Sequence, residues 1–235
     1  MSGQPDGTGG GNATPPSPAL PPMTPEGLAG LYPIFAECLR VAGPLERDFR
    51  RPSGFLGLLR IILEQQLSTQ VALTLWRKLE ARLDPITPAG LLSLNEDTLR
   101  ACGFSRQKII YGRGLAAAVE SGALDFERLH TLPDDAAAAA LMALKGVGRW
   151  TADIYLMMAL DRPDVWPVGD LAIQIGVQRL LALPARPGPL ELTAIAEPWR
   201  PHRSLAAKLI WHHYVAGQEA ARAQRSKPAE RNTPV

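Results

Sequence analysis

The stretch Leu144-Lys145-Gly146-Val147-Gly148-Arg149-Trp150-Thr151-Ala152 joins two predicted helices with almost no loop. Glycines at 146 and 148 permit a tight turn with positive φ and let another backbone come close. The helix that follows points its free amide groups and the positive end of its dipole outward, which creates a site for an anion. A DNA phosphate suits such a site. A simple connection with a glycine cap is the alternative, and a Rossmann loop is disfavoured because no strand precedes the glycines.

The sequence around this hairpin predicts helices and no strand of useful length. Apolar residues recur at three- and four-residue steps, and capping residues precede several of these runs. The predicted helices are one through Leu56, Leu59, Leu63 and Leu67, one after Ser68 or Thr69, one from Asn95 to Gly103, one from Ser105 to about Glu120, one from Asp134 to Leu144, one from Arg149 to Leu160, one from Asp170 to about Leu183, and one from about Pro201 to Ala216. The predicted fold class is therefore all-α.

The two ends of the chain differ in composition from this helical region. Residues 1–25 are rich in glycine and proline, and we expect a disordered leader. Residues 26–216 are predicted to form the helical domain, and residues 217–235 a polar tail that prolongs the last helix briefly. No run approaches the roughly 18 apolar residues of a membrane span, and no Lys or Arg occurs before Arg40 to suggest a signal peptide.

Charge and cysteine content exclude some functions and leave others open. The net charge is +2, but residues 1–39 carry three acidic and no basic groups, so the remainder is mildly basic and compatible with nucleic acid. The only cysteines are Cys38 and Cys102, which rules out a disulfide framework or a four-cysteine iron–sulfur cluster. A reducing cytoplasm fits this cysteine content.

The segment LKGVGRWTAD (144–153), followed twenty residues after Trp150 by Asp170 in WPVGDLAI, resembles the helix-hairpin-helix DNA glycosylase superfamily. Within it, the sequence is similar to the DNA-3-methyladenine glycosylase II type, which repairs alkylated DNA. The resemblance extends over residues 45–216, including LEQQLST (63–69) and PWRPHRSLAAKLIW (198–211). It implies two helical lobes with the DNA and base cleft between them, and a monomer. Larger members carry an N-terminal β-domain, for which too few residues precede the core here.

Asp170 is the candidate catalytic residue. Breaking an N-glycosidic bond leaves positive charge on the sugar, and a fixed carboxylate in a dry site stabilises that charge more than the neutral ground state. The carboxylate can also orient the attacking water. Alkylation already makes the base a good leaving group, so a second acid is dispensable. Alternatively, Asp170 is a helix N-cap, and the two roles can coexist if one oxygen caps while the other faces the sugar.

The resemblance also suggests that the reaction is simple hydrolysis. In relatives that cleave the DNA strand, a lysine that forms a Schiff base occupies the place of Trp150. Lys145 lies on the hairpin, five residues too early. We therefore expect a monofunctional enzyme without lyase activity.

Trp150 and Trp211 match aromatic positions that line the cleft of the family. An electron-rich indole suits an electron-poor alkylated base, through stacking and cation–π attraction. For Trp150 the alternative is core packing. Ile154 stands where relatives often have a third aromatic, which puts the specificity of the pocket in doubt.

A flipped base leaves a gap that a side chain must fill. By resemblance this wedge comes from residues 64–68, with Gln66 at the intercalating position and Leu67 as the other candidate. A helix end with two solvated glutamines is the alternative.

Cationic residues and a bound cation complete the expected interface. Lys145 and Arg149 are expected to support the phosphate contact of Gly146, Val147 and Gly148. Further candidates, each alternatively a solvated charge, are Arg106, Lys108, Arg200, Arg203 and Lys208. The histidines lack metal-ligand spacing, since His212 and His213 are adjacent. The resemblance implies instead a structural Na⁺ or K⁺ held by backbone carbonyl groups of Met142, Leu144 and Val147, and no required cofactor.

The resulting hypothesis is a monofunctional glycosylase that removes alkylated bases from double-stranded DNA, in the cytoplasm and at the nucleoid if the source is bacterial. One alternative is a related glycosylase for a mismatched, deaminated or oxidised base. The other is a helix-hairpin-helix module that binds DNA without chemistry. Asp170 and its tryptophans discriminate between them, because a pure binder needs only the hairpin.

Overall fold

The computed structural model describes residues 23–226, and this part of the chain contains helices and no strand. The elements are α1 (Pro25–Leu31), α2 (Pro33–Ala42), α3 (Phe55–Glu64), α4 (Thr69–Glu80), α5 (Pro88–Ser93), α6 (Glu96–Ala101), α7 (Arg106–Glu120), α8 (Phe126–Thr131), α9 (Asp134–Met142), α10 (Arg149–Met158), α11 (Leu171–Leu180), α12 (Pro189–Ala196), the 3-10 helix η1 (Glu197–Trp199) and α13 (Arg203–Ser226). The all-α prediction is confirmed. Residues 1–22, most of the expected leader, lie outside the described residues.

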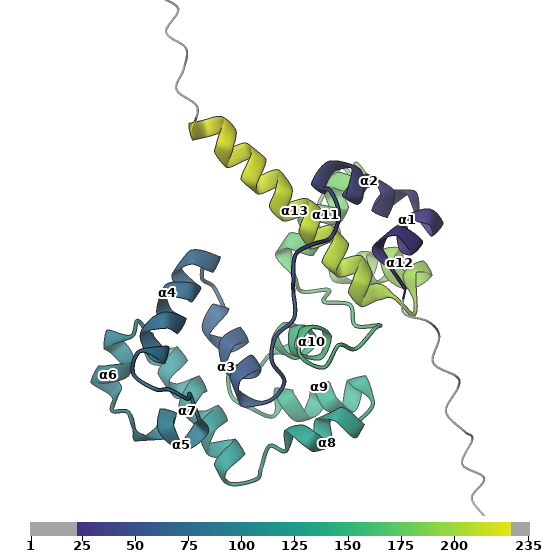
Figure 1. Ribbon diagram of the computed structural model, residues 1–235. Coiled ribbons are helices and arrows are strands. Elements are labelled where there is room, and N and C mark those ends of the chain that lie inside the picture. The colour runs from purple at the N-terminus through teal and green to yellow at the C-terminus, as the bar shows by residue number, and fades with distance from the viewer. Residues whose placement is uncertain (1–22, 227–235) are drawn as a thin grey trace, which may run out of the picture.

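The helices form two lobes (Figure 1). The beginning and end of the chain build one lobe, in which α2 and α11 pack against α13. The middle of the chain builds the other, in which α7 packs against α3 and α5, and α10 joins α9 to α3. Because the chain crosses between the lobes twice, residues far apart in sequence meet at the junction.

A cavity of about 430 Å³ lies between α9 and α10 on one side and α12 and α13 on the other. Charged residues of both lobes line it, among them Asp134, Arg149 and Asp153 opposite Arg200 and Arg203. It places polar groups beside the junction of the lobes.

Side-chain caps explain where most predicted helices begin. Ser68, Asn95 and Ser105 each accept a backbone N–H three residues further on, as predicted. Thr24, Thr87 and Asp125 do the same for α1, α5 and α8, which were not predicted. These three helices have six or seven residues, too few to show a clear hydrophobic period.

Several predicted helix ends are wrong. The helix that was expected to reach Leu67 ends at Glu64. The last helix continues past Ala216 into the tail, as expected, but it runs on to Ser226, further than the brief prolongation that was predicted. This last helix extends beyond its lobe as a projecting rod (Figure 1). The alanine-rich helix stops at Met142, and the helix after Asp170 stops at Leu180, each a turn or less short of the expected end. Pro25, placed in the leader, is the first residue of α1.

The crossing at residues 43–54 is held by backbone contacts to α10. The amide of Arg51 donates to the carbonyl of Met158 (2.8 Å), and the amide of Gly54 donates to the buried Tyr155 hydroxyl (2.7 Å). Burial raises the pKa of Tyr155 to about 12, so this hydroxyl keeps its proton. In residues 23–226, no helix combines the length and apolar character needed to cross a membrane.

Candidate active site and nucleic-acid interface

The glycine hairpin lies between α9 and α10, as predicted, but its two glycines do different things. Gly146 has a φ of 92°, and a Cβ there would fall 2.3–2.6 Å from ring atoms of Tyr111. Only glycine fits this position. Gly148 has an ordinary extended backbone (φ −93°) and is the N-cap of α10 without a side-chain hydrogen bond. The prediction of positive φ is therefore confirmed for Gly146 and wrong for Gly148.

A cavity of about 610 Å³ opens beside this hairpin. The glycines at 146 and 148 line it together with Gln66, Lys108 and Ser105, the N-cap of α7. No side chain caps α10, so its first amide groups keep their capacity for an anion. The cavity is thus polar, and the hairpin backbone reaches it.

The two hairpin cations are placed differently. Lys145 is exposed. Arg149 donates from Nε to Oδ1 of Asp153 (2.8 Å), and one of its terminal nitrogens lies 3.7 Å from Asp135. Part of the charge of Arg149 is therefore neutralised inside the protein. Sequence spacing could have suggested this pair, since Arg149 and Asp153 are four residues apart on one helix.

Asp153 itself is a buried carboxyl group that was not singled out from the sequence. It is 1% exposed, and burial raises its pKa to about 6 although the Arg149 guanidinium opposes the shift. It faces the interlobe cavity rather than the hairpin cavity.

Asp170 lies at the N-terminus of α11 with three N–H groups directed at its carboxylate. Oδ1 accepts the amide of Ile173 (2.9 Å) and the indole of Trp211 (3.0 Å), and Oδ2 accepts the indole of Trp150 (2.8 Å). The predicted N-cap role is confirmed. Oδ2, the oxygen that was expected to face the sugar, already accepts one N–H group, from Trp150.

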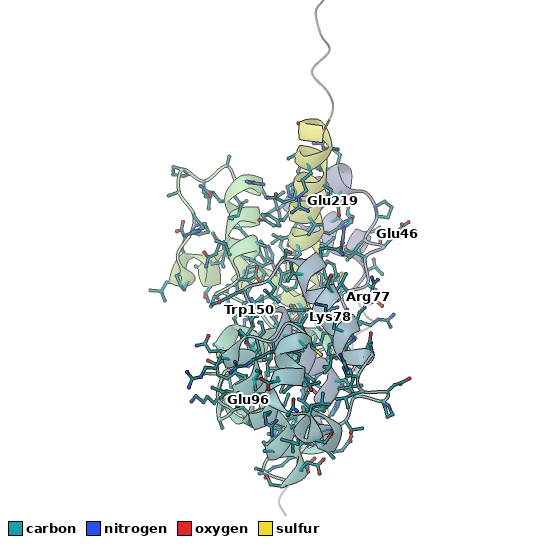
Figure 2. The ribbon with its side chains drawn as sticks, turned by 90° about the vertical axis from the view of Figure 1, so that its left-hand side faces the viewer. Glu46, Arg77, Lys78, Glu96, Trp150 and Glu219 are labelled. Carbon is teal, nitrogen blue, oxygen red and sulfur yellow. The ribbon has the colours of Figure 1, made fainter. Side chains whose placement is uncertain are left out.

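The structure brings Trp150 and Trp211 together at Asp170 although 61 residues separate them in sequence. Trp150 is half-buried at the second position of α10, at the level where the lobes meet (Figure 2). It therefore connects the hairpin to the carboxylate through one side chain. Trp211 is 7% exposed, and Ile154 is buried in the core.

Phe49, in the crossing at residues 43–54, is an aromatic of this site that sequence reasoning missed. Its ring centroid lies 5.9 Å from that of Trp211, at an interplanar angle of 35°. It is half-buried, and a lone aromatic in a segment without helical period carries no signal that would have marked it.

The wedge candidates lie directly after α3. Gln66 is exposed and has a φ of 57°, whereas Leu67 is half-buried and packs against the core. Both line the hairpin cavity. Of the two, only Gln66 protrudes.

Most of the further cations are engaged within the protein. Arg203 and Arg200 both bind the Asp164 carboxylate (2.7 Å each), and Lys208 lies 3.3 Å from Asp161. Lys108 donates to the backbone carbonyl groups of Ile62 and Gln65, at the C-terminal end of α3. Of the five, only Arg106 remains as an exposed cation with no ion pair among the described residues.

The carbonyl groups proposed for a cation lie around the hairpin. That of Leu144 accepts the amide of Val147 (3.1 Å) and keeps one lone pair. Such neutral, hard oxygen donors suit Na⁺ or K⁺ better than a transition metal. Residues 23–226 hold no cluster of three His, Cys, Asp or Glu side chains that could bind a metal.

The fold and the hairpin define a class of protein. The chain belongs to the HhH-GPD superfamily of base excision DNA repair proteins, which matches residues 59–201. Its relatives include DNA-3-methyladenine glycosylase 1 of Schizosaccharomyces pombe, which is 28% identical over 78% of this chain and 83% of that protein. DNA-3-methyladenine glycosylase 2 of Escherichia coli is 29% identical over 78% and 74%.

Solved structures agree with this grouping. The 3-methyladenine DNA glycosylase of Schizosaccharomyces pombe in complex with abasic DNA has a TM-score of 0.72 at 28% identity, covering 78% of this chain and 92% of that one. A DNA-3-methyladenine glycosidase from Bacillus halodurans has a TM-score of 0.68 at 30% identity, covering 83% and 89%. The recognised resemblance is confirmed.

Proposed function

We propose that this protein is a DNA glycosylase that hydrolyses the N-glycosidic bond of alkylated bases, of the 3-methyladenine and 7-methylguanine type, and so begins base excision repair. The observation that carries the proposal is Asp170, held by the indoles of Trp150 and Trp211 one side chain away from the glycine hairpin. A module that only binds DNA would need the hairpin but not this arrangement.

The geometry of Asp170 leaves room for its catalytic role. A carboxylate has about four lone-pair positions, and three of them take N–H groups here. The remaining position, on Oδ2, is the one left for the sugar or for the attacking water. Asp170 is 8% exposed as a residue, so its side chain is mostly shielded from water but not sealed. A preorganised charge in such a place stabilises the developing oxocarbenium ion.

We further propose that the reaction is hydrolysis without strand cleavage. By resemblance, Trp150 stands where strand-cleaving relatives have the lysine that forms a Schiff base. It directs an indole N–H, not an amine, at Asp170. Lys145 is exposed on the hairpin, where its ammonium can meet a phosphate. No Schiff base is expected.

Double-stranded DNA with a damaged base is the proposed partner, bound by a monomer. The hairpin amides and Lys145 contact the lesion strand, Gln66 enters the stack, and the extruded base meets the faces of Trp150 and Trp211. A Na⁺ or K⁺ ion at the carbonyl groups of Met142, Leu144 and Val147 would hold the hairpin in shape. We place this activity in the cytoplasm, and at the nucleoid in a bacterium.

A panel of duplexes tests the proposal. Purified protein is incubated with duplexes containing 3-methyladenine, 7-methylguanine, hypoxanthine, 8-oxoguanine or uracil, and the released base is measured beside strand breaks at the abasic site. We expect release of the two alkylated purines and no strand breaks. Release of another base alone would assign a different lesion, and binding without any release would leave a non-catalytic DNA-binding module.

A further inference from the structure

The segment that carries the wedge is a tight turn with a strained centre. Helix α3 ends at Glu64, whose carbonyl accepts the amide of Leu67 (3.2 Å), and Gln66 between them has a φ of 57°. Positive φ is uncommon for a residue other than glycine and persists only where the surroundings impose it. The hydrogen bond of the turn supports this conformation locally, and two side-chain contacts from outside the turn add to it.

The first such contact is the side chain of Gln65. Its amide nitrogen, Nε2, donates to the carbonyl oxygen of Gly146 (3.1 Å) and to the hydroxyl oxygen of Thr151 (2.8 Å). One partner belongs to the hairpin and the other, 2% exposed, to the first turn of α10. A single amide group thus joins the wedge turn to the element that is proposed to bind phosphate.

The second contact comes from α7. The ammonium of Lys108 donates to the carbonyl oxygens of Gln65 (2.8 Å) and Ile62 (3.4 Å), at the C-terminus of α3. A cation stabilises this end of a helix because the helix dipole is negative there. Burial lowers the pKa of Lys108, so it is a partly desolvated ammonium and not a freely solvated one.

We propose that Gln65 and Lys108 are positioning residues, which hold Gln66 as a preformed wedge and fix it to the hairpin. This inference rests on the proposed function. When the hairpin binds a DNA phosphate, Gln66 is placed against the base stack in the same step, because the turn that carries it is already ordered. Extrusion of a base costs a few kcal/mol, and a wedge that needs no ordering leaves more binding energy for it.

Removing the contacts made by Gln65 and Lys108 should strongly reduce extrusion of the base and should have little effect on the chemical step. Losing two partly buried hydrogen bonds at the wedge is expected to lower base release from a paired duplex roughly 10- to 100-fold. A lesion in single-stranded DNA is already unstacked, so its release should change less than about threefold. A general structural defect would lower both rates together.

The variants are Gln65→Met, which keeps the length of the side chain without its donor, and Lys108→Met. Lys108→Arg keeps a cation with N–H donors and should restore much of the duplex rate. Gln224→Met, at an exposed position near the end of α13, is the matched control for a glutamine change. Thermal unfolding of each variant confirms that it is folded.

Single-turnover base release is measured on paired and single-stranded 7-methylguanine DNA, and 2-aminopurine next to the lesion reports extrusion by its fluorescence. Selective loss on the paired duplex, with weaker fluorescence, is the expected result. If the variants lose base release equally on paired and single-stranded DNA, or lose it on neither, the inference is overturned. If the unaltered protein releases no base at all, the proposed function fails, and the fluorescence still decides whether Gln65 and Lys108 govern extrusion.

A double substitution adds a check that a structural role cannot imitate. Thr151→Val removes one acceptor of the Gln65 amide and keeps the shape of the side chain. If the two residues act through one contact, Thr151→Val should reduce base release from duplex DNA by a larger factor when it is made in the unaltered protein. In the Gln65→Met background, where that contact is already lost, the same change should have less effect. Equal effects in both backgrounds contradict the link between wedge and hairpin.

Discussion

Two buried aspartates at the site differ in the groups that surround them. Asp170 accepts three N–H groups, whereas Asp153 is paired with one arginine whose side chain is 56% exposed. The first is held by neutral donors and keeps an oxygen lone pair for a ligand. The second carries a desolvation cost that a half-exposed cation offsets only in part. Burial alone therefore does not distinguish a reacting group from a structural one.

Replacing Asp170 by asparagine should abolish base release while DNA affinity stays within a few-fold. Asparagine is also a good N-cap, so α11 should persist, but the negative charge facing the sugar is lost. We expect single-turnover release to fall by at least about 100-fold. Asp125→Asn changes a comparable cap on α8 and serves as the control. Undiminished release by Asp170→Asn would remove this residue from the mechanism.

Asp153 should make folding stability depend on pH in the opposite sense to most carboxyl groups. Its folded pKa of about 6 lies above the ordinary value of 3.8, so the folded protein holds a proton that the unfolded chain releases. This contribution is fully present below about pH 4 and is lost as the pH rises through about 6. Relative to Asp153→Asn, the unaltered protein should lose roughly 1 kcal/mol of unfolding free energy between about pH 5 and 7.5. Urea unfolding measures this, and a constant difference between the two proteins contradicts it.

The hairpin shows how one element depends on a residue far away in sequence. Gly146 has to be glycine because Tyr111, on α7, occupies the space a Cβ would take. Gly148 has no atom within 4 Å of its Cβ position and an extended backbone. Identical residues two positions apart therefore face different constraints. At Gly146 the requirement for glycine is steric, whereas at Gly148 neither the backbone nor the surrounding atoms impose it.

This difference predicts unequal costs of the two alanine substitutions. Gly146→Ala combines a strained φ with overlap against a ring and should destabilise the fold by about 2 to 4 kcal/mol. Gly148→Ala should cost less than about 1 kcal/mol. Chemical unfolding of both variants compares them directly. Equal losses would mean that Tyr111 moves aside.

At the scale of the whole described structure, residues 23–226, most of the cations that were expected to contact DNA are engaged within the protein. Arg149, Arg200, Arg203 and Lys208 all face carboxylates of the protein itself, and Lys108 faces carbonyl groups. Lys145, on the hairpin, is exposed and has no ion pair among the described residues. We therefore expect Lys145, beside the hairpin, to contribute more to the salt dependence of DNA binding than the paired cations do.

Lys145→Ala should weaken binding to any DNA sequence and reduce the slope of log K against log salt by about one. Arg149→Ala should have a smaller effect on the slope, because Asp153 and Asp135 already balance part of its charge. Arg186→Ala, an exposed change on the other lobe, makes the same change in net charge and should leave the slope unaltered. Titrations at several salt concentrations measure the slope for all three variants. Equal slopes would mean that DNA does not bind at the hairpin.

The sequence by itself determined the helices with long periodic faces, the caps at Ser68, Asn95 and Ser105, the hairpin, and Asp170 at a helix start. These features depend on interactions over three or four residues, which spacing records. Only the tertiary structure decided that Phe49 lies against Trp211, that Gln65 reaches Thr151, and that both tryptophans bind Asp170. Those contacts join segments that lie at least twenty residues apart in the sequence, so no local pattern specifies them.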